Sequence, residues 1–174
     1  MKNTIIKTKR FTLRPVRKKD SFSLAKNVND KEVARNTISI PYPYILKDAH
    51  CWINKNNRLR KSKEPREINF VIDIKGEVAG AVGLTDIEGH EAQIGYWLGR
   101  NYWGQGLMTE AVKAVTQFGF NRLKRVRIYA YVFPFNKSSR RVLEKAGYQF
   151  EGILKKNTKK KGKFIDDYLF AKVK

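Results

Sequence analysis

Polar and apolar residues alternate in some stretches of this chain and recur at helical spacing in others, which predicts a mixture of strands and helices. Alternation and apolar runs predict strands at 9–16, 68–74, 78–87, 94–98, 124–133, 148–154 and 164–173. Helical spacing predicts helices at 21–29, at 31–35, from Asp48 into the charged run 54–66, from Leu107 past Val115, and at 136–145. The lysine-rich segment between the last two strands is expected to be a hairpin loop.

Turn and cap signals separate these elements. Lys75-Gly76 predicts a tight hairpin turn, Asp30 a helix N-cap, and Gly147 a left-handed helix C-cap. Gly80 and Gly83 weaken the strand that carries them and predict a bulge or a close approach by another segment. The resulting order is strand, helices, three strands, helix, strand, helix and two strands. We therefore expect an α+β fold, with a mixed sheet and helices on both faces, in one domain spanning 1–174.

The segment 94–115 forms the centre of this arrangement. An apolar strand runs through the polar, glycine-bearing turn 99–105 into a helix. Gly104 and Gly106 let the backbone approach an anion without an intervening side chain, and the first helical turn has amide groups with no intrahelical partner. Residues 103–109 are thus predicted to hold a phosphorylated cofactor, although a tight turn with no ligand has the same sequence signal.

Composition narrows the class of protein. Hydrophobic residues make up 41% of the chain, which is typical of a folded globular domain. No apolar run approaches the ~20 residues of a membrane span, and the N-terminus lacks a signal-peptide pattern, so we expect a cytoplasmic protein without membrane contact. Cys51 is the single cysteine, which excludes an internal disulfide. It offers no metal-binding spacing, and we expect it half-buried on a helix.

The turn also carries a resemblance. The pyrophosphate-binding pattern of the GNAT acetyltransferase superfamily, Gln/Arg-x-x-Gly-x-Gly/Ala, falls on residues 103–108. Gly106 matches this pattern, whereas Trp103 and Met108 depart from it. The sequence of residues 102–111, YWGQGLMTEA, resembles that of the same segment in the branch that acetylates the N-terminal amines of ribosomal proteins. The segments 136–148 (NKSSRRVLEKAGY), 147–156 (GYQFEGILKK) and 162–171 (GKFIDDYLFA) resemble the same branch, and the element order resembles the GNAT fold across nearly the whole chain.

This resemblance implies a cosubstrate and a set of site residues. Acetyl-CoA would lie where the strand holding Ile94 splays from the strand holding Tyr131. The residues implied in binding it are Trp97, Leu98, Gly99, Trp103, Gly104, Gln105, Gly106, Leu107, Met108, Thr109 and Asn136. Asn136 would bond the pantetheine amide, a backbone N–H near Leu98 would stabilise the oxyanion, and Ser139 would donate to the leaving sulfur. The alternatives are a helix N-cap for Asn136 and an ordinary first-turn serine for Ser139.

The acceptor side is less constrained by sequence. The rigid loop 37–45, TISIPYPYI, offers Tyr42 and Tyr44 either to line a pocket or to pack over the core edge. Many relatives carry a glutamate base where this chain has Gln93, and an amide cannot take a proton at neutral pH. Water-linked Glu91, Asp86 or Glu88, or deprotonation in solvent, would have to replace it. No metal is expected.

Charge favours some acceptors over others. The chain has 37 basic and 16 acidic residues, a formal net charge of +21. Such a surface attracts anions, including coenzyme A and ribosomal RNA, and it repels strongly cationic small substrates. The alternative is that these charges only keep the surface solvated and bind no nucleic acid. An α-amine, with a pKa near 7.7–8.0 against about 10.4 for lysine, is readily neutral.

Three functions remain open at this point. The first is a protein N-terminal acetyltransferase with possible ribosome contact, acting as a monomer or homodimer. The second is a GNAT enzyme acting on a small amine such as a polyamine, aminoglycoside or amino acid. The third is a non-catalytic ribosome- or RNA-binding module.

Overall fold

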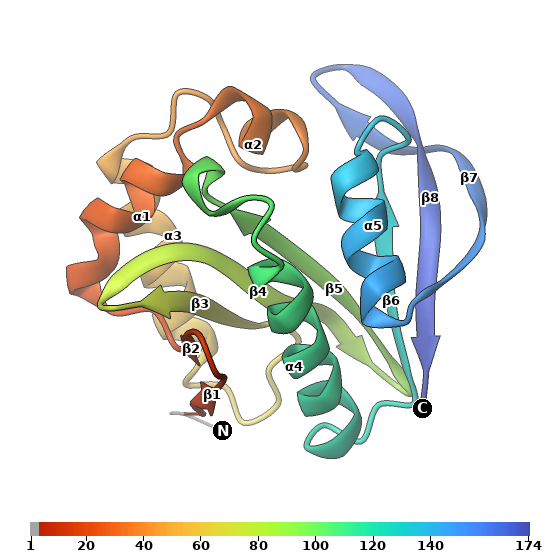
Figure 1. Cartoon of the computed structure of the whole chain (residues 1–174), viewed down its shortest axis with the longest axis horizontal. Coiled ribbons are helices and arrows are strands. Elements are labelled where there is room, and N and C mark those ends of the chain that lie inside the picture. The colour runs from red at the N-terminus through yellow and green to blue at the C-terminus, as the bar shows by residue number, and fades with distance from the viewer. Residues whose placement is uncertain (1–3) are drawn as a thin grey trace.

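The computed structural model describes residues 4–174, which form one eight-stranded mixed sheet with helices on both faces (Figure 1). The strand order across the sheet is β1-β2-β3-β4-β5-β6-β8-β7. The strands are β1 (Ile6–Lys7), β2 (Thr12–Arg14), β3 (Ile68–Ile74), β4 (Glu77–Glu88), β5 (Glu91–Leu98), β6 (Arg127–Val132), β7 (Gln149–Lys160) and β8 (Lys163–Val173). The order and the mixed sheet agree with the sequence prediction.

The helices divide between the two faces and build two cores. They are α1 (Ser21–Val28), α2 (Lys31–Arg35), α3 (Leu46–Leu59), α4 (Leu107–Asn121) and α5 (Lys137–Ala146), with short 3₁₀ turns η1 (Lys18–Asp20) and η2 (Arg100–Tyr102). Apolar residues of α4 and α5 pack on one face around Phe70, Leu84 and Ile128. Those of α1 and α3 pack on the other, around Val71 and Val78. Successive side chains of β3 point to opposite faces of the sheet, so this one strand contributes residues to both cores.

The two middle strands part from each other. β5 and β6 run parallel and pair over three positions, Glu91 to Gln93 against Arg127 to Tyr129. Beyond Gln93, β5 continues to pair with β4 as far as Leu98, and β6 continues to pair with β8 as far as Val132. The facing edges of β5 and β6 therefore have no strand between them from Ile94 onward, and the ribbons diverge there in Figure 1.

The glycines of β4 mark a close approach, as the sequence predicts. A Cβ on Gly80 would lie 2.5 Å from the carbonyl oxygen of Trp97, and one on Gly83 would lie 2.0 Å from Oδ1 of Asn69. A register shift between Thr85 and Glu88 adds a bulge near the end of this strand. The Asp30 N-cap and the left-handed Gly147 C-cap are also confirmed.

The lysine-rich segment expected as a loop is strand instead. β7 continues through it to Lys160, and the turn is confined to Lys161-Gly162. Two features outside the segment stabilise this extension: Thr158 donates to Asp167 Oδ2 at 2.6 Å, and Lys160 Nζ donates to the carbonyl oxygens of Ala34 and Arg35. Both contacts are made to residues outside the segment, so its own composition could not predict them.

Three smaller expectations were wrong. The predicted strand at 9–16 is the short β2 preceded by the separate strand β1. The third helix begins at Leu46, and Asp48 bonds back to the N–H of Ile45 at 2.9 Å from within the first turn. Cys51 lies on that helix as expected, but it is exposed rather than half-buried. Within residues 4–174, no helix is both long and apolar enough to cross a membrane.

Candidate active site

A cavity of about 960 Å³ opens between the diverging strands and reaches both faces of the sheet. On one face it is walled by the turn before α4 and the first turn of α5. On the other it is walled by α1, α2 and the loop that follows α2. Because β5 and β6 no longer pair beyond Gln93, one molecule can enter from each face of the sheet and the two can meet between these strands.

The turn leading into α4 lines the first side of the cavity. Gly104 (φ 76°) and Gly106 (φ 72°) adopt left-handed backbone conformations that favour glycine. Gly106 is the N-cap of α4, so the N–H groups of the first helical turn have no intrahelical partner. A Cβ on Gly106 would come no nearer than 3.7 Å to any atom outside the turn, leaving room for an anion at this helix start.

Arg10 ties this turn to the rest of the molecule. Its Nη1 donates to the carbonyl oxygen of Gln105 at 2.6 Å, and its Nε donates to Glu110 at 2.7 Å. Nε1 of Trp103 donates to the carbonyl oxygen of Leu98 at 2.7 Å, which joins the turn to the end of β5. These contacts hold the turn at both ends.

The edge of β5 offers backbone groups to the cavity. The N–H of Gly99 donates to Ala79 in β4 at 2.8 Å, and along a strand successive N–H groups point to opposite edges. The N–H groups of Trp97 and Gly99 therefore face β4, whereas those of Tyr96 and Leu98 face the gap. An acyl group or an amide-containing chain lying in the gap would meet donors at Tyr96 and Leu98.

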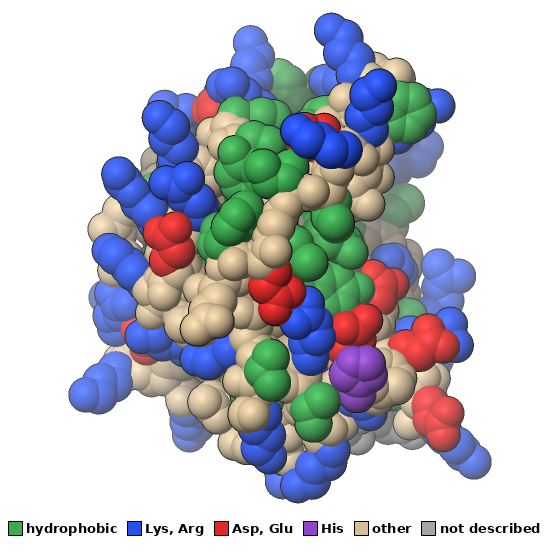
Figure 2. Space-filling view, turned by 90° about the vertical axis from the view of Figure 1, so that its right-hand side faces the viewer, with side chains coloured by type: hydrophobic (Ala, Val, Ile, Leu, Met, Phe, Trp, Pro, Cys, Tyr) green, Lys and Arg blue, Asp and Glu red, His purple; other side chains and the backbone are tan. Residues whose placement is uncertain are grey.

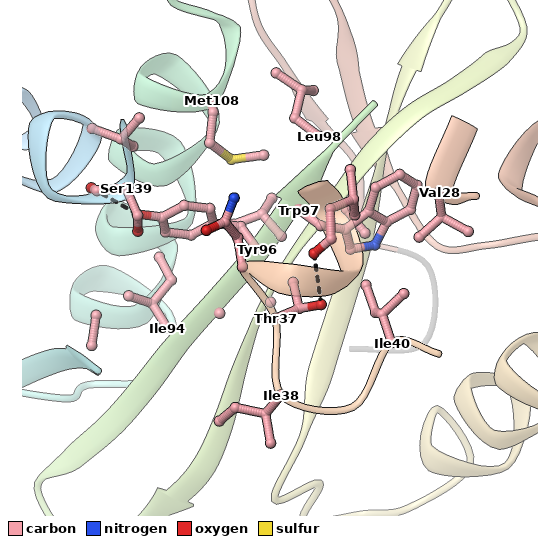
Figure 3. Close-up of a pocket in the computed structure, with 18 of the residues that line it drawn as sticks. Val28, Thr37, Ile38, Ile40, Ile94, Tyr96, Trp97, Leu98, Met108 and Ser139 are labelled. Carbon is pink, nitrogen blue, oxygen red and sulfur yellow. Dashed lines mark hydrogen bonds between the residues drawn. The ribbon is translucent and has the colours of Figure 1, made fainter. Parts of the chain in front are cut away.

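The first turn of α5 faces this edge across the gap. Asn136 Oδ1 accepts from the N–H of Ser139 at 3.0 Å, so Asn136 is the N-cap of α5 while its side chain also lines the cavity. The Ser139 hydroxyl lies 2.8 Å from the hydroxyl of Tyr96 on β5 (Figure 3). Burial raises the pKa of Tyr96 well above the ordinary value for tyrosine, so it stays protonated at neutral pH and can donate.

The opposite side of the cavity is apolar. Val28 of α1 and Ile40 lie near Trp97 in Figure 3. Ile38 lies on the same loop as Ile40, the one that follows α2, and also lines the cavity. Tyr44 is 8% exposed and also lines the wall, with its pKa raised to about 12 by burial and by nearby Asp48. Tyr42 lies outside the wall, 45% exposed, with Lys31 Nζ 5.7 Å from its ring centre.

The carboxylates suggested as bases lie away from the gap. Glu91 pairs with Arg127 at 3.4 Å where β5 and β6 are still joined. Glu88 pairs with Arg66 at 3.4 Å, and Asp86 is exposed in the β4 bulge. Gln93 does line the cavity, as does Asp167, a carboxylate of β8.

The structure therefore places most of the predicted residues together. The wall includes Trp97, Leu98, Trp103, Gly104, Gly106, Leu107, Met108, Thr109, Asn136, Ser139, Tyr44 and Gln93. Gly99, Gln105, Tyr42 and Glu91 lie outside it. Gly99 is buried against Asn27, and the Gln105 side chain turns back to Asn101. No group of side chains suited to a metal ion occurs in residues 4–174.

Tyr96 and Asp167 are the residues that sequence reasoning missed. Tyr96 shares its strand face with Ile94 and Leu98, so alternation assigns it to the core. Asp167 follows Asp166 in a mostly apolar strand, and a carboxylate at an inward strand position is a usable signal because such groups are rarely buried without a partner.

The fold and this cavity define an acyltransferase of the GNAT type. A model of the acetyltransferase (GNAT) domain matches residues 10–149, and the chain belongs to this family. It is an N-acetyltransferase that uses acetyl-CoA as its cosubstrate.

Individual relatives match most of the chain. It is 34% identical over 169 residues to the uncharacterized N-acetyltransferase p20 of Bacillus licheniformis, covering 96% of this chain and 94% of that protein. It is 27% identical to spermidine N(1)-acetyltransferase of Escherichia coli K12, covering 82% and 74%. Among solved structures it resembles RimL, a ribosomal L7/L12 alpha-N-protein acetyltransferase in complex with coenzyme A, with a TM-score of 0.86, 22% identity and 98% coverage of both chains.

Proposed function

We propose that this protein transfers the acetyl group of acetyl-CoA to the N-terminal α-amine of a protein, by direct attack in a ternary complex. The observation that carries the proposal is the cavity open to both faces of the sheet. It has a glycine-lined helix start on one face and an apolar chamber on the other. An extended peptide terminus suits a chamber that is open to solvent and apolar inside.

The cosubstrate is assigned to the α4 and α5 side. In the proposal, the N–H groups at 104–109 bind the pyrophosphate, as main-chain donors at a helix start do. The gap-facing N–H groups of Tyr96 and Leu98 take the pantetheine amide or the thioester oxygen, where negative charge develops in the transition state. Asn136 keeps Oδ1 in its helix cap, and its amide nitrogen is assigned to the pantetheine chain.

Ser139 is assigned to the leaving group. As the C–S bond breaks, the sulfur gains negative charge, and a hydroxyl next to it supplies a hydrogen bond or a proton. The neighbouring Tyr96 hydroxyl, 2.8 Å away, holds the Ser139 hydroxyl in place by a hydrogen bond. A thiol pKa of about 8.5 means that this assistance contributes to the rate without being indispensable.

The basic surface supports an acidic docking partner such as the ribosome. The net charge is +21, and lysine and arginine side chains occupy much of the edge of the face shown in Figure 2, whereas acidic side chains gather on its right-hand side beside the hydrophobic band. A positive field of this kind speeds encounter with RNA and falls with added salt.

A small-amine acceptor is the second candidate, favoured by the similarity to the spermidine acetyltransferase. The experiment that separates the two incubates the protein with isotopically labelled acetyl-CoA and a ribosome preparation or cell lysate, followed by mass spectrometry. We expect label on the N-terminus of one or a few proteins, above an enzyme-free control for chemical acetylation. Label confined to polyamines or other small amines would overturn the protein acceptor.

A further inference from the structure

Asp167 is a buried carboxylate in the cavity wall with an unused oxygen. It is 1% exposed, and Oδ2 accepts from Asn157 at 2.9 Å and from Thr158 at 2.6 Å. Oδ1 has no hydrogen-bond partner within residues 4–174. Burying a carboxylate oxygen without a partner is costly, because the charge loses its hydration. Oδ2 therefore has its hydrogen bonds and holds β7 in place, whereas Oδ1 can still accept a hydrogen bond.

Strand register puts Asp167 on the acceptor face of the sheet. Tyr168 pairs with Val132 and packs with the α4 and α5 core, so the next side chain along β8 points to the opposite face. Tyr131 of β6 points to that same face and also lines the cavity. Asp167 is one of the groups that raise the pKa of Tyr131, after burial and Glu91. Asp167 and Ser139 therefore lie on opposite faces of the sheet, and both line the one cavity.

We infer that Asp167 and the apolar wall formed by Val28, Ile38, Ile40 and Trp97 make up the acceptor subsite, which takes a primary ammonium group carried on an apolar body. This inference rests on the proposed acetyl transfer and names the group that replaces the base missing at Gln93. The wall contacts the apolar body, and Oδ1 of Asp167 takes the N–H bonds of the ammonium group.

The same contact supplies the proton acceptor for the reaction. The ammonium gives one proton to Oδ1 of Asp167, and the freed lone pair forms the C–N bond with the thioester carbonyl. When the tetrahedral intermediate collapses, the C–S bond breaks and a second proton leaves nitrogen for sulfur by way of the Ser139 hydroxyl. Asp167 then releases its proton to water, which leaves the N-acetyl product and free coenzyme A.

The test uses phenethylamine, which carries one primary amine on an apolar body, with acetyl-CoA and the full chain. We expect transfer by the wild type and a fall of about 100-fold in kcat/KM for Asp167→Asn, within the range of general-base catalysis, with acetyl-CoA affinity unchanged. Without the carboxylate, the variant can use only amine that is already neutral in solution. The fall in its kcat/KM relative to the wild type should therefore become smaller as the pH rises toward the amine pKa, about 10.4 for an alkylamine such as lysine. A purely structural role would not produce this trend.

Two matched variants separate binding from folding. Asp166→Asn alters the neighbouring carboxylate, which bonds Lys155 and the N–H of Lys156 on the exposed side, and should leave kcat/KM within about twofold. Thr158→Val removes one bond to Oδ2 and leaves Oδ1 untouched. A loss in Thr158→Val equal to that in Asp167→Asn, with no pH trend, would overturn the inference.

The remaining outcomes distinguish this inference from the proposed function. Equal rates in Asp167→Asn and the wild type, or a wild type that acetylates protein N-termini but not phenethylamine, would overturn the subsite and leave acetylation of protein N-termini standing. A wild type that binds acetyl-CoA and acetylates phenethylamine but no protein N-terminus would overturn the proposed acceptor and leave the subsite intact.

Discussion

The hydroxyl groups of Tyr96 and Ser139 lie 2.8 Å apart, joining the free edge of β5 to the first turn of α5. The two residues are 43 positions apart in sequence, and each lines the cavity between the diverging strands. This pair is the contact that spans the strand gap on the side assigned to acetyl-CoA. It brings a hydroxyl donor to the place where the proposed mechanism needs one.

We expect Ser139→Ala to lower kcat by about 10- to 100-fold while acetyl-CoA affinity changes less than threefold, since the hydroxyl acts on charge that develops in the transition state. Tyr96→Phe keeps the ring and should lower kcat by a smaller factor, because Ser139 retains its own proton. Steady-state kinetics with calorimetry of acetyl-CoA binding checks both. Equal turnover in Ser139→Ala and the wild type would return Ser139 to a structural role.

We expect Gly106→Val to weaken acetyl-CoA binding by at least about 30-fold, because a branched side chain at φ 72° both strains the turn and occupies the space in front of the helix start. The control is Gly76→Val, a hairpin-turn glycine at φ 88° with nothing within 4 Å of an added Cβ. Both variants should lose stability by a similar ~1–3 kcal/mol, but Gly76→Val should bind acetyl-CoA normally. Unchanged affinity in Gly106→Val would remove the pyrophosphate assignment.

The buried ion pair of Arg14 and Asp20 should dominate local stability under the α1 side of the sheet. Nη1 and Nη2 of Arg14 donate to the two oxygens of Asp20 at 2.7 and 3.0 Å, and both side chains are at most 3% exposed. Asp20→Ala leaves a buried guanidinium short of a partner and should cost about 3–5 kcal/mol. The exposed pair of Glu32 and Arg35 is the control, since Glu32→Ala should cost at most ~1 kcal/mol. Urea unfolding measures both.

Alkaline pH should destabilise the fold through its buried tyrosines. Burial raises the pKa of Tyr44 to about 12, and it raises that of Tyr148 above the ordinary value despite the hydrogen bond to Thr116. The unfolded tyrosines ionise near pH 10 while the folded ones stay neutral, so their stabilisation is complete below pH 10 and is lost as pH rises from 10 towards 12. In this pH range each of the two tyrosines lowers the free energy of unfolding by about 1.4 kcal/mol per pH unit.

Tyr148→Phe tests this prediction. The variant loses the 2.7 Å contact with Thr116, so its stability at pH 7 should fall. Its unfolding free energy should nonetheless decline less steeply than that of the wild type between pH 10 and 11. Parallel curves for the two proteins would mean that Tyr148 ionises as easily in the fold as in the unfolded chain.

Local patterns in the sequence determined much of this protein. Alternation at 68–74 and 94–98 and helical spacing from Leu107 follow directly from which side chains face a core, so the strand and helix order was predictable. Gly104 and Gly106 revealed the turn before α4 because only a glycine adopts such φ values without strain. The resemblance of 102–111 and 136–148 to one family then implied the strand gap.

Tertiary structure alone decided the rest. Lys155 to Lys160 has the composition of a loop, yet it is strand because Asp167 and the carbonyl groups at the C-terminal end of α2 bind its side chains. The contact of Tyr96 with Ser139 and the unpaired oxygen of Asp167 depend on where strands diverge and on register between distant segments. No local pattern encodes those distances, because a residue's periodicity fixes which face it occupies but not which residue of another element it meets.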